Sequence, residues 1–368
     1  MSLRVRKELL ELSPCEHGGK AGEIADRLGI EKGSLIDFSV SLNPYVPLDV
    51  EGAIRRACDT IFAYPDNSYV RFRESAARFV GVDADDIVPG NGSTEIIRLF
   101  AEAVIENGDI VAIPSPTFGE YEQQCRLFGA GIRHVRFSDI ASGKYGRLEG
   151  CKAAFLCNPN NPDGLLLPRN EVERVVRYCR DNGIMVVVDE AFIDLADPAQ
   201  SVVQLVESYD NLLVMRSLTK CFAIPGLRLG FGVAGRDAAR TLNMARLTWN
   251  LDSIAVEAGI YLMDNAGSCL EASRDFIKRE REWLASRIGE IGGLRALPSS
   301  VNYFLVDVGG TGMTSGEFAE KMMRERIIVR NCSSFPMIGG QYIRVAVRNH
   351  EENMRLIDAL CRVAGVRH

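Results

Sequence analysis

One lysine is set apart by its neighbours. Lys220 lies in the stretch RSLTKCFAIPGLRLG, residues 216–230, among apolar residues, glycine and proline, with Ser217 before it and Arg228 after it. Lysine is rarely placed in apolar surroundings unless it is paired or functional. An amine that has lost its proton in a partly apolar pocket can attack an aldehyde and form a Schiff base. We therefore interpret Lys220 as a nucleophilic amine rather than a solvated surface lysine.

Residues that directly follow predicted strands are the next candidates, because ligands of open α/β sheets bind beyond the carboxyl ends of the strands. Asp189 ends the run VVVD, and the turn CNPNNPDG follows another apolar run. The segment VPGNGSTE joins a strand to a helix whose free N–H groups suit a phosphate. The candidates from these segments and from SPTFGEY are Gly92, Ser93, Thr94, Phe118, Asn161 and Asp189.

Taken singly, each of these features has an ordinary explanation. A glycine-rich turn is often only a capped helix start, an aspartate after a strand is often a cap or an ion-pair partner, and a phenylalanine usually belongs to the core. Together they provide a lysine for an aldehyde, a carboxylate that keeps a pyridine nitrogen protonated, and a helix N-terminus for a phosphate. Those are the requirements of pyridoxal 5′-phosphate, with Ser217 and Arg228 as phosphate ligands beside Lys220.

The elements that must position these residues follow from the hydrophobic pattern. Seven short apolar runs between residues 85 and 236 alternate with helix-like segments, which predicts an α/β fold with a mostly parallel seven-stranded sheet. Helices are expected from Ser93 to about Asn107 and from near Pro168 to Gly183. The predicted strands lie in DIVPGNG, DIVAIPSP, GIRHVRF, AAFLCNP, IMVVVDEA, LLVMRSL and RLGFGVAG.

The pattern of apolar and charged residues changes after about residue 253. A long charged helix, DFIKREREWLASRIGEI, is followed by the shorter segments VNYFLVDVGG, FAEKMMRER, RIIVRNC and YIRVAVR. We expect three parts: an N-terminal segment, residues 1–44, that has no sheet of its own and packs against a small domain; a large domain, 45–260, that binds the cofactor; and the small α+β domain, 261–368.

The composition excludes several classes of protein. The 368 residues include 43 Lys and Arg against 49 Asp and Glu, a net charge of −6 without a basic block, so nucleic acid and anionic membrane are not expected partners. The N-terminus lacks a signal stretch and no apolar run is long enough to span a membrane, which predicts a cytoplasmic protein. Ten scattered cysteines are expected to be reduced packing residues. His134 and His350 are isolated, so no metal site is expected.

The order of YPD, GNGSTE, PTFGEY, NPNNPDG, VVVDEAF, SLTK and GLRLG resembles that in the fold type I pyridoxal-phosphate enzymes of the class II aminotransferase branch, over essentially the whole chain. The resemblance implies that Lys220 binds the cofactor aldehyde, Asp189 pairs with the pyridine nitrogen and Asn161 bonds the 3-oxygen. Phe118 would stack on the ring, and Tyr64 of YPD would reach the phosphate of a neighbouring subunit, which implies a homodimer with shared active sites. The implied phosphate ligands are Gly92, Ser93, Thr94, Ser217 and Arg228.

Within that branch, HGGK, DEAFIDL, RIIVRNCSSFP and YIRVAVRNHEEN are more similar to the L-threonine-O-3-phosphate decarboxylases of cobalamin biosynthesis than to the histidinol-phosphate aminotransferases. The resemblance then implies that His17 and Arg330 bind a substrate phosphate and Arg344 its carboxylate. Arginine can grip either anion in bidentate fashion. Ordinary roles stay open: strand-edge charges for the two arginines, and a helix cap or turn for His17.

Three positions depart from the family pattern: Ser41 stands for asparagine, Asp163 for threonine and Lys20 for asparagine. They bear on the substrate and leave the predicted cofactor unaffected. Decarboxylation and transamination differ in which bond at Cα is aligned with the ring, so the alternative is a histidinol-phosphate or related aminotransferase that uses 2-oxoglutarate. A non-catalytic sensor on the same fold is a further alternative, and the complete set of Lys220 and Asp189 with the phosphate ligands argues against it.

Overall fold

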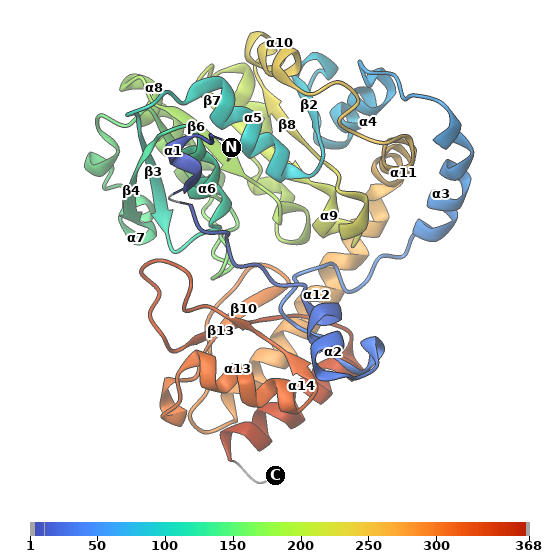
Figure 1. The fold of residues 1–368 in the computed structure, drawn as a ribbon, viewed down its shortest axis with the longest axis vertical. Helices are drawn as coiled ribbons and strands as arrows, with labels where there is room; N and C mark the ends of the chain where they lie inside the picture. Colours follow the sequence, from blue (N-terminus) through green and yellow to red (C-terminus); the bar gives the residue numbers. More distant parts are fainter. Residues whose placement is uncertain (1–3, 11, 366–368) are drawn as a thin grey trace.

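The computed structural model describes residues 4–10 and 12–365. The chain forms two lobes, with a seven-stranded sheet in the upper lobe of Figure 1 and a four-stranded sheet in the lower lobe. Each predicted apolar run forms one strand of the larger sheet, so the predicted α/β fold is confirmed. Its strands, in the spatial order β2-β8-β7-β6-β5-β3-β4, are β2 (Ile87–Gly90), β3 (Ile110–Ser115), β4 (Gly131–Arg136), β5 (Ala153–Cys157), β6 (Met185–Asp189), β7 (Leu212–Ser217) and β8 (Gly230–Ala234).

Neighbouring strands of this sheet run parallel except at β8, which is antiparallel to both β2 and β7. The strands are nearly continuous apolar runs because helices cover both faces of the sheet. In β6, for example, each residue after Met185 is buried. The adjacent parallel strands β5, β6 and β7 end at one edge, and this edge therefore carries Cys157, Asp189 and Ser217.

Two apolar layers cover the two faces of the sheet. One layer contains residues of α5 (Ser93–Val104), α6 (Glu120–Leu127) and α10 (Arg236–Ala245). The other contains residues of α4 (Val70–Val80), α7 (Phe137–Ala141), α8 (Arg169–Asp181) and α11 (Ser253–Asp264), and α3 (Val50–Ala57) packs on α11. The two predicted helices are present as α5 and α8. The first ends at Val104, earlier than expected, because the backbone of Ile105 is extended, with φ −92° and ψ 126°.

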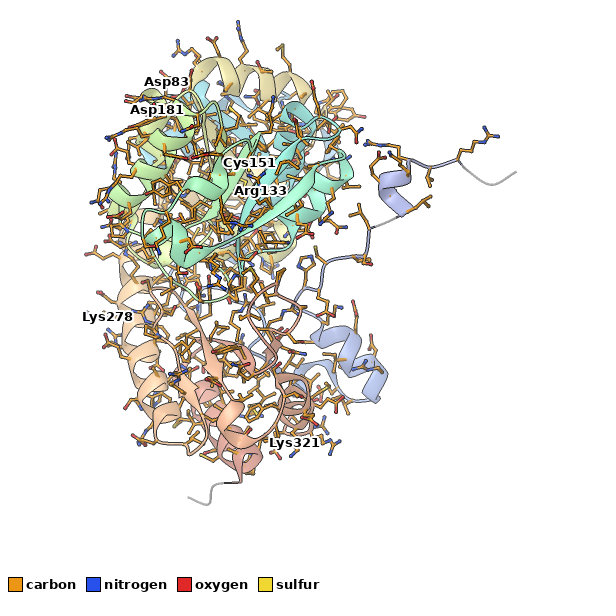
Figure 2. All side chains as sticks on the ribbon, turned by 90° about the vertical axis from the view of Figure 1, so that its left-hand side faces the viewer. Asp83, Arg133, Cys151, Asp181, Lys278 and Lys321 are labelled. Atoms are coloured by element: carbon orange, nitrogen blue, oxygen red, sulfur yellow. The ribbon has the colours of Figure 1, made fainter. Side chains whose placement is uncertain are left out.

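The lower lobe contains an antiparallel sheet of β9 (Arg295–Ala296), β10 (Tyr303–Asp307), β12 (Arg330–Asn331) and β13 (Tyr342–Ala346), in the order β12-β13-β10-β9. The predicted long charged helix is α12 (Ala266–Gly289), which runs from the upper lobe into the lower one (Figure 1). It shares an apolar core with α13 (Ser315–Arg324) and α14 (His350–Ala364). Lys278 on α12 and Lys321 on α13 mark this lobe in Figure 2. Within residues 4–10 and 12–365, no helix has the length and apolar character needed to cross a membrane.

The N-terminal segment passes along one side of both lobes (Figures 1 and 2). α1 (Lys7–Leu10) contacts α6 of the upper lobe, and α2 (Ala21–Leu28) lies beside the lower lobe. This segment is expected to have no sheet of its own, and its strand β1 (Ile36–Asp37) pairs in parallel with β11 (Ile327–Ile328) of the lower lobe. A two-residue strand is too short to produce a hydrophobic period, so the sequence pattern could not reveal it.

Candidate active site

A cavity of about 460 Å³ lies at the carboxyl ends of the strands of the larger sheet, with residues of both lobes and of the N-terminal segment in its wall. The structure brings to it all of the predicted site residues except Tyr64. They are His17, Gly92, Ser93, Thr94, Phe118, Asn161, Asp189, Ser217, Lys220, Arg228, Arg330 and Arg344.

Lys220 lies on α9 (Leu218–Cys221), the short helix that directly follows β7. Its Nζ atom is 5.8 Å from the centre of the Phe192 ring. Burial, and then the positive charges of Arg344 and Arg228, lower the pKa of the Lys220 amine to about 8. Near neutral pH, a fraction of the amine is therefore uncharged, as required of a nucleophile that attacks an aldehyde.

Asp189 is the last residue of β6 and is 4% exposed. Its Oδ2 atom accepts a hydrogen bond from the Tyr121 hydroxyl at 2.6 Å, and Oδ1 accepts one from the N–H of Ala191 at 2.9 Å. Burial raises the pKa of the Asp189 carboxyl, and the Tyr121 hydrogen bond opposes this rise. The two donors hold the carboxylate in one orientation in the cavity wall, where it can pair with a protonated pyridine nitrogen.

The start of α5 forms a cup that has no side chain at its base. Gly92 is the N-cap of α5, with φ 75° and ψ 161°, a conformation essentially restricted to glycine. A Cβ atom at Gly92 would lie 2.8 Å from Nη2 of Arg228. Backbone N–H groups at a helix N-terminus, hydroxyl groups and a guanidinium group together suit a phosphate. The hydroxyl groups in this part of the cavity wall belong to Ser93, Thr94 and Ser217.

Aromatic rings form two walls of the cavity. The ring centres of Phe118 and Tyr121 are 5.6 Å apart, with an angle of 80° between the rings. Those of Phe192 and Tyr303 are 4.9 Å apart, with an angle of 73°. Because these edge-to-face contacts hold each ring against a buried tyrosine, the cavity has apolar walls of defined shape beside the amine.

Arg344 reaches the cavity from β13 and is 7% exposed. Its Nη1 atom donates to Oδ1 of Asn161, and its Nη2 atom donates to the carbonyl oxygen of Ser39 at 2.8 Å. The guanidinium carbon lies 5.1 Å from the centre of the Tyr303 ring. Both acceptors are neutral oxygens, so the positive charge of Arg344 is available to an anionic ligand such as a carboxylate.

Two further side chains, His17 and Arg330, join the N-terminal segment to the two lobes beside the cavity. Nε2 of His17 lies 2.8 Å from Oε1 of Glu120 on α6, and this hydrogen bond lowers the pKa of the Glu120 carboxyl. Arg330 of β12 donates to the carbonyl oxygen of Glu16 at 2.8 Å and to Oγ of Ser334 at 2.9 Å. The segment is therefore bound to the upper lobe through His17 and to the lower lobe through Glu16.

Two buried polar atoms in the cavity wall have no hydrogen-bond partner among the described residues: Oγ of Ser41 and Nε of Arg344. Buried polar groups are nearly always hydrogen-bonded, so such atoms mark a place for a polar ligand. Lys220, Asp189 and the glycine cup supply the amine, carboxylate and anion site that pyridoxal 5′-phosphate requires, and the residues present therefore fit this cofactor.

Asp163, one of the departures from the family pattern, has a local role. Its Oδ1 atom accepts hydrogen bonds from Nδ2 of Asn160 at 3.0 Å and from the N–H of Leu165 at 3.1 Å, as in an Asx turn. Burial raises the pKa of its carboxyl. Lys20, another departure from the pattern, is the exposed N-cap residue of α2. The carboxylate of Asp163 therefore stabilises the turn in which it lies.

Among the residues of the cavity wall that sequence reasoning missed are Glu16, Glu120 and Tyr121. Tyr121 and its partner Asp189 are 68 positions apart in the chain, and His17 and Glu120 are 103 apart. No local pattern connects residues at such separations. The available signal was the place of Glu120 and Tyr121 two and three positions after Phe118 in SPTFGEY.

Tyr64 lies outside the cavity of its own chain. Its side chain is 79% exposed, and its ring stacks on that of Trp249 with the centres 4.5 Å apart. The expectation that it reaches a neighbouring subunit concerns a second chain and stays a prediction.

Comparisons with known proteins place this geometry in a family. The family described as aminotransferase class I and II matches residues 34–360. The histidinol-phosphate aminotransferase of Methanothermobacter thermautotrophicus is 29% identical over 97% of this chain and 96% of its own length. The threonine-phosphate decarboxylase of Salmonella typhimurium is 32% identical over 94% of this chain and 96% of its own length.

A solved structure has the same fold. The histidinol-phosphate aminotransferase of Sinorhizobium meliloti, in complex with pyridoxal-5′-phosphate, superposes with a TM-score of 0.85 at 21% identity and covers 99% of this chain and 98% of that one. The protein is therefore an enzyme of the class I and II aminotransferase family, and its cofactor is pyridoxal 5′-phosphate.

Proposed function

We propose that the protein decarboxylates L-threonine O-3-phosphate to (R)-1-amino-2-propanol O-phosphate, a step of cobalamin biosynthesis in the cytoplasm, and that it works as a homodimer with shared active sites. The observation that carries the proposal is the set of His17 and two arginines, Arg330 and Arg344, around a cavity that also contains the proposed cofactor residues. A substrate with one phosphate and one carboxylate matches this set. The similarity to a threonine-phosphate decarboxylase supports it.

In this proposal, two of these side chains bind the substrate phosphate and the third binds its carboxylate. His17 and Arg330, which lie on the N-terminal segment and on β12, bind the substrate phosphate and exchange their present carboxylate and carbonyl partners for it. Arg344 and Asn161 lie hydrogen-bonded to each other in the wall and hold the substrate carboxylate. By holding the carboxylate, these two residues align the bond between Cα and the carboxylate for cleavage, rather than the bond between Cα and hydrogen.

The bond between Cα and the carboxylate then breaks, carbon dioxide leaves, and a proton takes its place at Cα. The cofactor, when bound, supplies a ring that accepts the electron pair. Asp189, held by Tyr121 and Ala191, keeps the proton on the ring nitrogen. Lys220 would hold the cofactor aldehyde until the substrate amine takes its place. The released Lys220 amine, whose pKa is about 8, would then carry the proton to Cα near neutral pH.

Transamination is the second candidate, because a histidinol-phosphate aminotransferase is similar over nearly the whole chain. His17 and Arg330 would bind the phosphate of histidinol phosphate equally well, and Arg344 would hold the carboxylate of 2-oxoglutarate. The two reactions differ in the bond that breaks at Cα, and both use Lys220 and Asp189.

Product analysis tests the proposal. The holoenzyme is incubated with L-threonine O-3-phosphate alone, and separately with histidinol phosphate and 2-oxoglutarate. We expect carbon dioxide from the first mixture without any keto acid. Glutamate from the second mixture, with no carbon dioxide from the first, would contradict the proposal and favour the aminotransferase.

A variant pair tests the phosphate site. Arg330→Gln should raise KM for the phosphorylated substrate at least about 10-fold with a smaller change in kcat, because a charged hydrogen bond to the phosphate is lost. Arg348→Gln is the matched control, because Arg348 pairs with Glu352 in the same lobe and does not line the cavity. Equal KM values for the two variants would remove Arg330 from the substrate site.

A further inference from the structure

A buried cluster of three ionisable side chains lies behind the cofactor residues. It consists of Glu190, Asp194 and Arg216, which are 0%, 5% and 4% exposed. Nη2 of Arg216 donates to Oδ1 of Asp194, and Nη1 of Arg216 lies 3.7 Å from Oε2 of Glu190. The three side chains are absent from the cavity wall, so the proposed reaction does not use them directly.

The surroundings hold the Glu190 carboxylate of the cluster, whereas Nε of Arg216 has no hydrogen-bond partner among the described residues. The Glu190 carboxylate accepts hydrogen bonds from the Ser201 hydroxyl and from the N–H of Val202, both at 2.6 Å. The Arg216 guanidinium carbon lies 5.6 Å from the centre of the Phe79 ring. A buried ion cluster is nevertheless weak as a source of stability, because the loss of hydration can exceed the attraction between the charges. Its best-attested use is to fix one arrangement of the chain.

The arrangement fixed here is that of two cofactor residues. Glu190 directly follows Asp189, and Arg216 directly precedes Ser217. Within each dipeptide, one side chain lines the cavity and the other joins the cluster, as the alternation of side chains along extended backbone requires. The strand ends are also joined through the backbone, since the N–H of Glu190 donates to the carbonyl oxygen of Met215 at 2.9 Å.

We propose that Arg216 is a positioning residue for the cofactor. By holding Glu190 and Asp194 behind the sheet, Arg216 keeps Asp189 at the end of β6 and Ser217 at the end of β7 in the relative placement that the pyridine nitrogen and the phosphate of one cofactor molecule need. The inference concerns cofactor binding, so it holds for either candidate reaction.

The test is a titration of the apoprotein with pyridoxal 5′-phosphate, followed by absorbance, together with thermal unfolding of each apoprotein. Glu190→Gln keeps the shape of the side chain and removes the charge, and we expect the dissociation constant of the cofactor to rise at least about 10-fold. Arg216→Met should have an effect at least as large, and Arg216→Lys should restore part of the affinity. Unchanged cofactor affinity in Glu190→Gln would overturn the proposal, whether or not Arg216→Met folds.

Asn211→Ala is the matched control. Asn211 is buried next to the opposite end of β7, where its Nδ2 atom donates to the carbonyl oxygens of Val176 and Ile184. This variant should lower Tm without changing cofactor affinity. If it weakens cofactor binding as much as Glu190→Gln does, the cluster is merely structural and the proposal fails.

A double-mutant cycle makes the distinction independent of stability. Ser217→Ala removes a phosphate ligand, and its effect on cofactor affinity should be smaller in the Glu190→Gln protein than in the wild type, because Ser217 is already displaced there. Additive effects would overturn the positioning role. No substrate is present in these titrations, so failure of the proposed function and failure of this inference are separate outcomes.

Discussion

At the scale of the residue, the site is built by placing ionisable groups where water cannot solvate them. Lys220 is pushed toward its neutral form by burial and by two guanidinium groups. Burial raises the pKa of Asp189 and so favours its neutral form, whereas the hydrogen bond from the Tyr121 hydroxyl favours the charged form. Both shifts follow from the cost of a charge in a region of low dielectric constant. The unfolding free energy of the apoprotein therefore depends on pH through these shifted pKa values.

Lys220→Met should stabilise the apoprotein at pH 7. The folded-state pKa of about 8 lies below the value of 10.5 for a free lysine, so the folded protein releases this proton before the unfolded chain does. Below pH 8 the wild type keeps a poorly solvated charge, at a cost of about 3 kcal/mol, and this cost disappears as the pH rises from 8 to 10.5. Urea unfolding of the wild type and the variant at pH 7 and pH 10 measures this difference in unfolding free energy.

The control for this experiment is Lys278→Met, at an exposed position on α12 (Figure 2). Its unfolding free energy should match that of the wild type at both pH values. A gain in Lys220→Met that is the same at pH 7 and pH 10 would contradict the assignment of the gain to the buried charge.

Tyr121→Phe should weaken cofactor binding on the acid side of the pH range. The lost hydroxyl leaves a buried carboxylate oxygen with one donor fewer, at a cost of about 1–3 kcal/mol. The pKa of Asp189, already raised by burial, rises further, so the carboxyl is neutralised at a higher pH. Titrations with cofactor over a pH series should show the acid limb of the affinity profile displaced to higher pH.

Tyr303→Phe is a matched change, because the Tyr303 hydroxyl is equally buried but donates to the carbonyl oxygen of Asn160 at 2.8 Å. It should leave the acid limb in place. If both variants displace the profile alike, Tyr121 has no special connection to Asp189.

At the scale of the element, strand ends and a helix start meet at one edge of the sheet. Parallel strands β5, β6 and β7 end together, and α5 begins with a glycine whose backbone conformation other residues avoid. The cup depends on this geometry more than on any side chain in it.

Gly92→Ala tests the cup. An alanine would have to adopt φ 75° and ψ 161°, at a cost of about 1–3 kcal/mol, and its Cβ atom would meet Nη2 of Arg228 at 2.8 Å. We expect lower Tm and at least about 10-fold weaker cofactor binding. Gly108→Ala separates the two effects, because Gly108 also has a positive φ of +94° but its Cβ atom would meet nothing within 4 Å. It should lower Tm and leave cofactor affinity unchanged, and an equal loss of affinity would contradict the role of the cup.

At the scale of the whole molecule, large apolar side chains gather on the two connections that flank Tyr64 and Trp249. Phe62 is 94% exposed, and Leu247 is 73% exposed. A single chain gains nothing from such exposure, and a patch of this kind marks an interaction site. The proposed homodimer supplies its occupant, a second copy of the chain.

Phe62→Asp should therefore shift the protein from dimer to monomer, because a charge is costly to bury in an apolar contact. Sedimentation velocity at micromolar concentration measures the change. Met354→Asp, at a position 44% exposed on α14 of the other lobe, should remain dimeric. A monomeric wild type would contradict the homodimer and with it the role predicted for Tyr64.

Much of this enzyme could be predicted from the printed residues. The seven strands and the place of Lys220, Asp189 and Arg228 in the cavity wall were accessible because each depends on a local pattern: an apolar run, a turn or a residue directly after a strand. The aminotransferase family was indicated by the resemblance of an ordered set of motifs. Local patterns can be recognised in a sequence because residues that are close in the chain belong to the same helix, strand or turn. The short strand β1, by contrast, has no pattern long enough to detect.

The contacts that complete the site needed the folded chain. Tyr121 meets Asp189, His17 meets Glu120, and Arg216 meets Asp194 and Glu190 across separations that no local pattern spans. Such pairs arise when packing brings distant elements together, and burial then decides their charge states. A sequence shows which groups can ionise, whereas their pKa values and their partners are properties of the surroundings that folding creates.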